Sequence, residues 1–197
     1  FLISVPGSQF KWFSESVFIH FNCSIMLLKM FLSIALSGLL WPNHVPLNIK
    51  EEGVSVEKKY SAEKGKIGIT MPGDYNVSES ESESVTTTKV TSTIGDVTYL
   101  FSWTLHSAVL EDSKGLADVS LESFNEQVQG DILTQSVYKY GRNEGKSATV
   151  SLAEGQVNCF YRVILIDQYQ FQMVVVTSDK ELNNVGKKFL NSFKYKK

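Results

Sequence analysis

The sequence has few of the residues from which catalytic sites are usually built. Its 197 residues include two cysteines, Cys23 and Cys159, and three histidines, His20, His44 and His106. Two cysteines cannot form a disulfide framework, and Cys159 is expected to be a free thiol in the core. His20 and His44 fall in segments expected to be removed or flexible, which leaves His106 as the histidine of the folded domain.

Familiar motifs of catalysis and cofactor binding are also missing. The domain contains no G-x-S-x-G elbow, Gly-rich phosphate loop, H-E-x-x-H or C-x-x-C motif, which disfavours the usual hydrolase, nucleotide and zinc chemistries. We therefore predict no enzyme activity, no catalytic residues, no cofactor and no metal. The alternative is an envelope hydrolase using His106 or Cys159, which requires one of these side chains to be accessible beside a nucleophile or base.

Positive charge is in short supply as well. Lys and Arg number 19 against 21 Asp and Glu, a formal net charge of −2 at pH 7. Such a chain has no overall positive field to attract a phosphate backbone, so nucleic acid is not expected as a partner. The composition is otherwise globular, with 43% hydrophobic and 20% charged residues.

A long apolar run occurs near the amino terminus. Residues 26–41 contain Met26, a positive charge at Lys29 and an apolar stretch that ends before Pro42, the pattern of a secretory signal peptide. The run is shorter than the roughly 20 apolar residues of a membrane-spanning helix. We therefore predict an exported protein of the bacterial periplasm or cell surface. A signal-anchored, membrane-tethered domain is the alternative if residues 26–40 are retained.

The segments on either side of this run are expected to lie outside the folded domain. Residues 1–25 show no sustained period, and we interpret them as non-structured or untranslated upstream sequence. Residues 42–59 carry prolines and charged pairs and are interpreted as a linker. Leu36-Ser37-Gly38 resembles the end of a bacterial lipoprotein signal, but Leu39 stands where the lipid-bearing cysteine is required, which disfavours a lipid anchor.

Residues 60–197 have the pattern of one α+β domain. Strands are predicted where β-branched and apolar residues lie between turn residues, at 66–71, 85–94, 97–109, 132–140, 147–152, 157–166 and 169–177. The clearest hairpin turns at Gly95-Asp96. Short loops indicate antiparallel neighbours, so we predict a central antiparallel sheet of about six or seven strands.

Two helices are expected to flank this sheet. Ser120 is predicted to cap a helix that Gly130 ends, with an apolar stripe at helical spacing between them. Ser178 and Glu181 form a capping box for a closing helix. Two helices against about seven strands are typical of an α+β fold, and a parallel α/β fold is disfavoured.

An acidic stretch follows the first predicted strand. Ser78 to Ser84 alternates Ser and Glu, and it is interpreted as a solvated loop because acidic residues without apolar partners cannot contribute to a core. Glu79, Glu81 and Glu83 lack the glycine turn and mixed ligands of a calcium loop, so metal binding is not expected there.

Aromatic residues are numerous, and most are expected to lie in the core. An open sheet face can nevertheless present some of them to a partner. Because a phenol tolerates water, the candidates for such a binding patch are Tyr138, Tyr140, Tyr161 and Tyr169.

Two stretches of the domain resemble the PsbP-like family of small bacterial exported domains. Tyr60–Pro72 (YSAEKGKIGITMP) is similar to the opening strand, which runs into a proline, and Phe189–Lys194 (FLNSFK) is similar to the closing helix, which ends in Ser-Phe. The same fold family includes extrinsic subunits of photosystem II and a Ran-binding import factor. The resemblance implies a PsbP-like sandwich and a non-enzymatic accessory that binds an unknown protein or small ligand of the envelope, and no functional residue is carried over.

Overall fold

The computed structural model describes residues 56–82 and 85–196. The predictions for residues 1–25 and 26–41 lie outside these ranges, as does most of the predicted linker. The strands and helices are β1 Glu57–Ala62, β2 Ile67–Pro72, β3 Asn76–Ser82, β4 Val85–Ile94, β5 Val97–His106, α2 Ser113–Val128, β6 Asp131–Tyr140, β7 Asn143–Leu152, β8 Val157–Ile166, β9 Tyr169–Thr177, α3 Asn184–Asn191 and β10 Lys194–Tyr195. The described helices include none long and apolar enough to cross a membrane.

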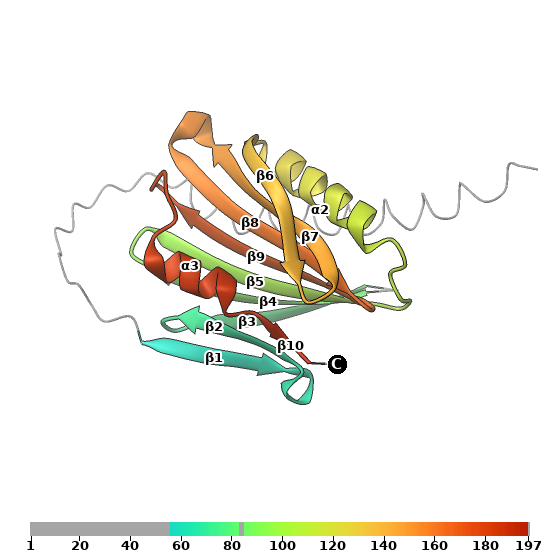
Figure 1. Cartoon of the computed structure of the whole chain (residues 1–197). Helices are drawn as coiled ribbons and strands as arrows, with labels where there is room; N and C mark the ends of the chain where they lie inside the picture. Colours follow the sequence, from blue (N-terminus) through green and yellow to red (C-terminus); the bar gives the residue numbers. More distant parts are fainter. Residues whose placement is uncertain (1–55, 83–84, 197) are drawn as a thin grey trace, which may run out of the picture. The chain divides into compact units, whose positions relative to one another are not determined.

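The predicted α+β class and central antiparallel sheet are confirmed. Seven strands form the large sheet in the order β3-β4-β5-β9-β8-β7-β6, and β1, β2 and β10 form a second, three-stranded sheet that was not predicted. Consecutive strands pair through short turns, such as the one at Gly95, whose φ of +60° suits glycine. Strand β6 therefore forms one border of the large sheet and β3 the other (Figure 1).

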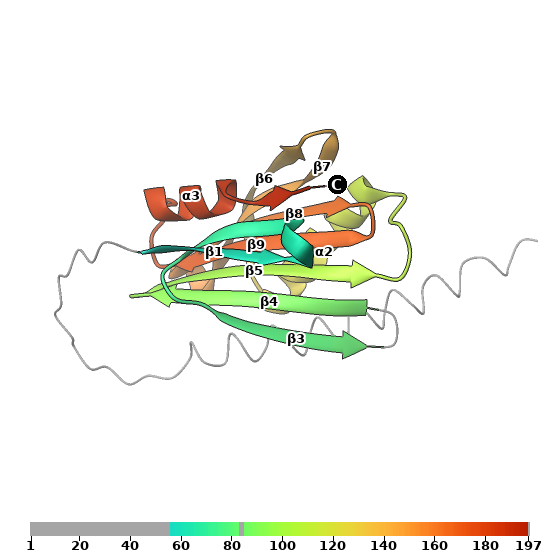
Figure 2. The same cartoon turned by 90° about the horizontal axis from the view of Figure 1, so that it is seen from below.

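The small sheet and α3 lie on one face of the large sheet, over the main aromatic core (Figure 2). Side chains alternate along a strand, so every second residue of β5 and β9 points to this face. Phe171 lies at its centre, with its ring centroid 6.4 Å from that of Phe101 and 4.8 Å from that of Phe193. Val97, Tyr99, Phe101 and Trp103 of β5 are all buried in this core, and Leu105 is partly buried beside them.

Helix α2 covers part of the opposite face, where it contacts β7 and β8. Its buried apolar residues include Leu121, Phe124 and Val128, which recur at helical spacing. Phe124 stacks on Tyr161 of β8 with ring centroids 4.3 Å apart. The domain thus has two cores, separated by the large sheet.

Several predicted boundaries were wrong. The Ser-Glu stretch is not a loop, because residues up to Ser82 form the border strand β3, which pairs with the Thr-rich β4. This strand is held by its backbone ladder with β4, and most of its side chains are exposed, so it needs no apolar residues. The linker prediction ran too far, since β1 begins at Glu57.

Both helix starts also differ from the prediction. Asp112, not Ser120, caps α2, and its Oδ1 accepts a hydrogen bond from the Gly115 amide at 2.9 Å. Asn183, not Ser178, caps α3 and accepts one from the Gly186 amide at 2.8 Å. In each case a nearby Asx side chain provides the cap.

Candidate functional site

Three of the seven large apolar side chains that are exposed in the described ranges lie along β6. The first seven side chains of this strand are exposed, and they include Ile132 at 37%, Leu133 at 58% and Val137 at 51% of their full accessible area. No charged residue occurs between Asp131 and Lys139. We call residues 132–138 the β6 edge.

The position of β6 in the sheet explains this exposure. Within the described ranges β6 pairs with β7 alone, so one row of its backbone donors and acceptors faces outward. The main contacts of α2 are with β7 and β8, and those of α3 are with β2 and β9. A border strand left open in this way is a template for another strand.

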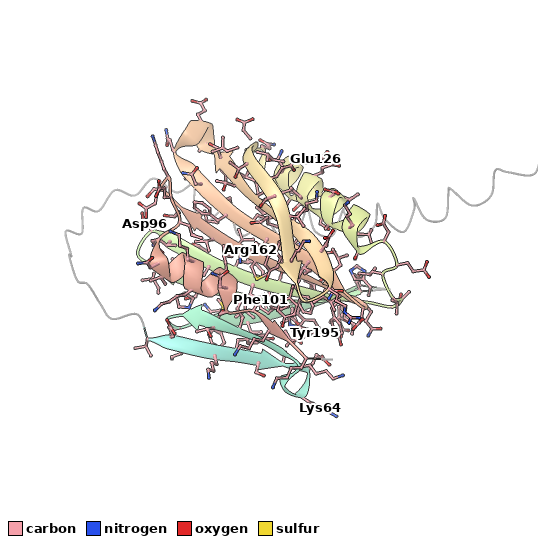
Figure 3. The ribbon with its side chains drawn as sticks, viewed as in Figure 1. Lys64, Asp96, Phe101, Glu126, Arg162 and Tyr195 are labelled. Atoms are coloured by element: carbon pink, nitrogen blue, oxygen red, sulfur yellow. The ribbon has the colours of Figure 1, made fainter. Side chains whose placement is uncertain are left out.

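Arg162 of β8 fixes the end of the β6 edge against α3. Its Cζ lies 4.9 Å from the ring centroid of Tyr138. Its Nη1 donates to the Leu190 carbonyl at 3.0 Å and to Asn191 Oδ1 at 2.8 Å, at the end of α3 where carbonyls lack helical partners. Figure 3 shows Arg162 between α3 and β6. The guanidinium therefore connects the border strand to the helix.

Electrostatics at this junction follow from burial. Burial lowers the pKa of Arg162, and the Tyr138 hydroxyl partly offsets this effect. Burial also raises the pKa of Tyr138, against the opposing effect of Arg162. The phenol therefore stays neutral at physiological pH, and the pair acts as a fixed cation–π contact.

Tyr140 holds the last residue of β6. Its hydroxyl accepts a hydrogen bond from the Tyr195 amide at 2.8 Å and donates to the Tyr195 carbonyl at 3.2 Å. Its ring packs on Phe193 with centroids 5.1 Å apart. The carboxyl-terminal end of β6 is thus fastened, while residues 132–137 remain exposed.

The four predicted tyrosines do not form a single surface patch. Tyr138 and Tyr140 are partly buried beside α3 and β10, and Tyr169 is buried in the core on the same face of the sheet. Tyr161 lies on the other face, fully buried under α2, with its hydroxyl 3.5 Å from the Ser120 carbonyl. Tyr161 is therefore removed from the predicted patch, and binding by the others stays a prediction.

Sequence reasoning missed the exposed apolar residues of β6. Their local pattern places Ile132, Leu133 and Val137 in an ordinary strand of the central sheet. The available signal was the low charge of this strand, but strand order, which makes β6 a border, is not readable from local pattern.

The two residues of the hydrolase alternative lie apart. Cys159 is 1% exposed, and burial raises the pKa of its thiol to about 12. Across the sheet, Cys159 is aligned with Val176 of β9 and, through Val176, with Thr98 at the start of β5. His106 lies at the other end of β5, eight residues after Thr98. This spacing corresponds to about 26 Å along the strand. Burial also lowers the pKa of His106, with a smaller opposing effect from a hydrogen bond to Gln170.

A groove between α3 and β2 is a weaker candidate because its polar groups are already occupied. Ser192 Oγ accepts a hydrogen bond from the Thr70 amide at 2.9 Å. Lys188 Nζ lies 3.7 Å from Glu57 Oε1 across the groove. Nor do the described ranges bring together three or more His, Cys, Asp or Glu side chains that could hold a metal ion.

Comparisons with known proteins identify a fold. No protein-family model matches the chain, and no curated protein matches it significantly. Cyanobacterial PsbP from Synechocystis has a similar structure, with a TM-score of 0.53 and 12% sequence identity, covering 77% of this chain and 100% of that one. A protein of Bacteroides thetaiotaomicron gives a TM-score of 0.37 at 8% identity over 71% of this chain and 48% of its own, which is too low to carry an argument. The chain therefore has a PsbP-like fold.

Proposed function

We propose that this chain is a non-catalytic binding or assembly accessory domain, exported to the bacterial cell envelope, which engages a partner along the β6 edge. The observation that carries the proposal is a border strand that is exposed and without charge along residues 132–137, and whose far end is fixed by Arg162 and Tyr140. A fixed strand loses little conformational freedom on binding, which favours association.

Export is supported by the signal-like pattern of residues 26–41. The likeness in fold to a cyanobacterial PsbP supports the resemblance to the PsbP-like family, from which the accessory role is inferred. The hydrolase alternative has less support at Cys159, because this thiol is buried and burial raises its pKa. A hydrolase using His106 stays the second hypothesis.

Export is tested by expressing the protein from Met26 in a bacterium and measuring intact mass in the periplasm, membrane and cytoplasm. We expect a periplasmic product shortened by about 12 to 25 residues. A full-length membrane product released only by detergent would favour the tethered alternative. An unprocessed cytoplasmic product would refute export and return attention to the intracellular branch of the fold family.

Binding is tested by affinity capture from envelope extract. Leu133→Lys places a charge on the β6 edge, and Val77→Lys is the matched control because Val77 is 48% exposed on the opposite border strand. We expect Leu133→Lys to lose a partner that the wild type and Val77→Lys both retain. Equal capture by all three proteins would contradict binding at β6.

A further inference from the structure

We propose that the β6 edge pairs with the β6 edge of a second copy of this chain, antiparallel and about a two-fold axis, with Gln135 opposite Gln135 of the second copy. The inference rests on the proposed function in that both use the β6 edge. It goes further by naming the partner and the register. Two-fold dimers with self-complementary interfaces are the commonest closed assemblies.

The order of residues in β6 is self-complementary. With Gln135 at the centre, Thr134 lies opposite Ser136 of the second copy. Beyond Thr134 the bulge between Ile132 and Thr134 places Ile132 and Leu133 together opposite Val137 of the second copy. Each pair joins like chemistry: amide with amide, hydroxyl with hydroxyl, and aliphatic with aliphatic. Such cross-strand pairs stabilise antiparallel strands.

The faces of the sheet agree with this register. A two-fold axis along the sheet normal places the α3 side of one copy beside the α3 side of the other. Thr134 and Ser136 pair with Thr149 and Ser147 of β7 and share the α3 side. Gln135 and Val137 point to the opposite side. The central pairs therefore meet on matching faces.

Charges at the two ends of the strand are also complementary. Because of the bulge, the register places Asp131 of each copy opposite Tyr138 of the other, one position away from Lys139. The same bulge turns Asp131 toward the α3 side, whereas Lys139 pairs with Glu144 on the α2 side. The two opposite charges therefore point to opposite faces from neighbouring positions, and they attract each other weakly through solvent rather than as a direct ion pair.

The contact that Lys139 makes within one copy does not prevent this arrangement. Lys139 Nζ lies 3.1 Å from Glu144 Oε1, but the lysine side chain is 70% exposed. Exposed ion pairs of this kind contribute little to stability. The lysine can therefore attract Asp131 of the second copy at small cost.

The other border strand fails the same comparison. A two-fold axis at Ser80 of β3 places Glu79 opposite Glu81 of the second copy, and an axis at Glu79 places that residue opposite itself. Like charges directly opposite each other destabilise a strand pair. Self-pairing of β3 about Glu79 or Ser80 is thus opposed by charge, whereas self-pairing of β6 about Gln135 is not.

The proposal is tested by sedimentation velocity. The sample is the purified protein after any processing by the expressing cell. A single strand pair is smaller than a standard interface of about 1,600 Å², so we expect a concentration-dependent monomer–dimer equilibrium between roughly 1 and 300 μM. A wild-type protein that stays monomeric over this range would overturn the proposal.

Charge exchange tests the register. Asp131→Lys and Lys139→Asp each place like charges near each other at both ends of the pair. Because these charges do not face each other directly, each variant alone is expected to raise the dimer Kd about two- to threefold at low salt. An equimolar mixture of the two variants restores opposite charges at both ends, so wild-type association should return. Circular dichroism checks that each variant is folded.

Two results would overturn the two-fold register: unchanged association of either single variant, or no recovery in the mixture. Neither result affects the proposed function, because capture of an envelope protein that depends on Leu133 is measured separately. A wild-type protein that self-associates but captures no envelope protein through Leu133 would instead overturn partner binding and leave the dimer standing.

Discussion

The two border strands of the large sheet, β3 and β6, face the same physical problem with different sequences. Each pairs with one neighbour and leaves its other edge open in the described ranges. Strand β3 carries Glu79 and Glu81 in its middle, whereas β6 has its charges only at Asp131 and Lys139, near its ends. Charge in the middle of an open strand discourages pairing, and its absence permits pairing.

The two borders also differ in how they are supported. Strand β6 is tied to α3 through Arg162 and to β10 through Tyr140. Strand β3 is held through its ladder with β4, where Thr88 Oγ1 also lies 3.4 Å from Glu79 Oε1. A border strand that has no charge in its middle and is held at one end is suited to assembly. A border strand with charges in its middle is suited to remaining unpaired at its open edge.

The largest expected effect comes from breaking the support of β6 at Gly145. A Cβ atom at this position of β7 would lie 2.1 Å from the Val163 carbonyl oxygen, a backbone atom. We expect Gly145→Ala to lower the free energy of unfolding by about 2 kcal/mol or more, because β7 must move away from β8. Urea unfolding measures this change.

Gly68→Ala is the matched control for that experiment. Gly68 is also a strand glycine, and a Cβ atom there would have the Tyr60 carbonyl oxygen as its nearest neighbour, at an ordinary 3.7 Å. Its stability should change by less than about 1 kcal/mol. Equal effects of the two substitutions would show that β7 and β8 are not in close contact at Gly145.

A smaller effect is expected from Arg162→Ala. This change removes two hydrogen bonds to the end of α3 and the cation–π contact with Tyr138. We expect a loss of about 1–3 kcal/mol in unfolding free energy, measured in urea. The control is Lys139→Ala, which removes an exposed ion pair and should lower the free energy of unfolding by less than about 1 kcal/mol. An equal loss of unfolding free energy in the two variants would contradict the role given to Arg162.

The smallest effect on stability is expected when β3 is made to resemble β6. The double change Glu79→Thr and Glu81→Thr replaces exposed charges with residues that favour strands, and unfolding free energy should shift by less than about 0.5 kcal/mol. Self-association should nevertheless increase in sedimentation experiments. A variant that associates no more than the wild type would show that charge is not what keeps β3 free.

Local pattern predicted much of this architecture. Strands 85–94, 157–166 and 169–177 match β4, β8 and β9 because alternation and turn residues define them. Strand β3 was missed because a border strand needs backbone pairing rather than apolar side chains. The short β10 was missed because it is stabilised by pairing with β2, which lies far away in sequence.

The candidate site was harder to predict than the fold. Tyr138 and Tyr161 are similar residues in neighbouring predicted strands, yet one lies beside α3 and the other is buried under α2. The face to which each points depends on register, and the exposure of Leu133 and Val137 depends on strand order. A short stretch of sequence encodes neither the register nor the strand order.

The self-pairing of β6 is tested most directly by cysteine cross-linking. Gln135→Cys in a Cys23→Ser chain places two thiols opposite each other at the proposed two-fold axis, and Ser80→Cys in the same chain is the control on β3. The native Cys159 is buried, with a thiol pKa raised to about 12, and should not react. We expect mild oxidation to give a disulfide-linked dimer with Gln135→Cys and little with Ser80→Cys; cross-linking that is equal in both, or absent at position 135, would contradict the pairing.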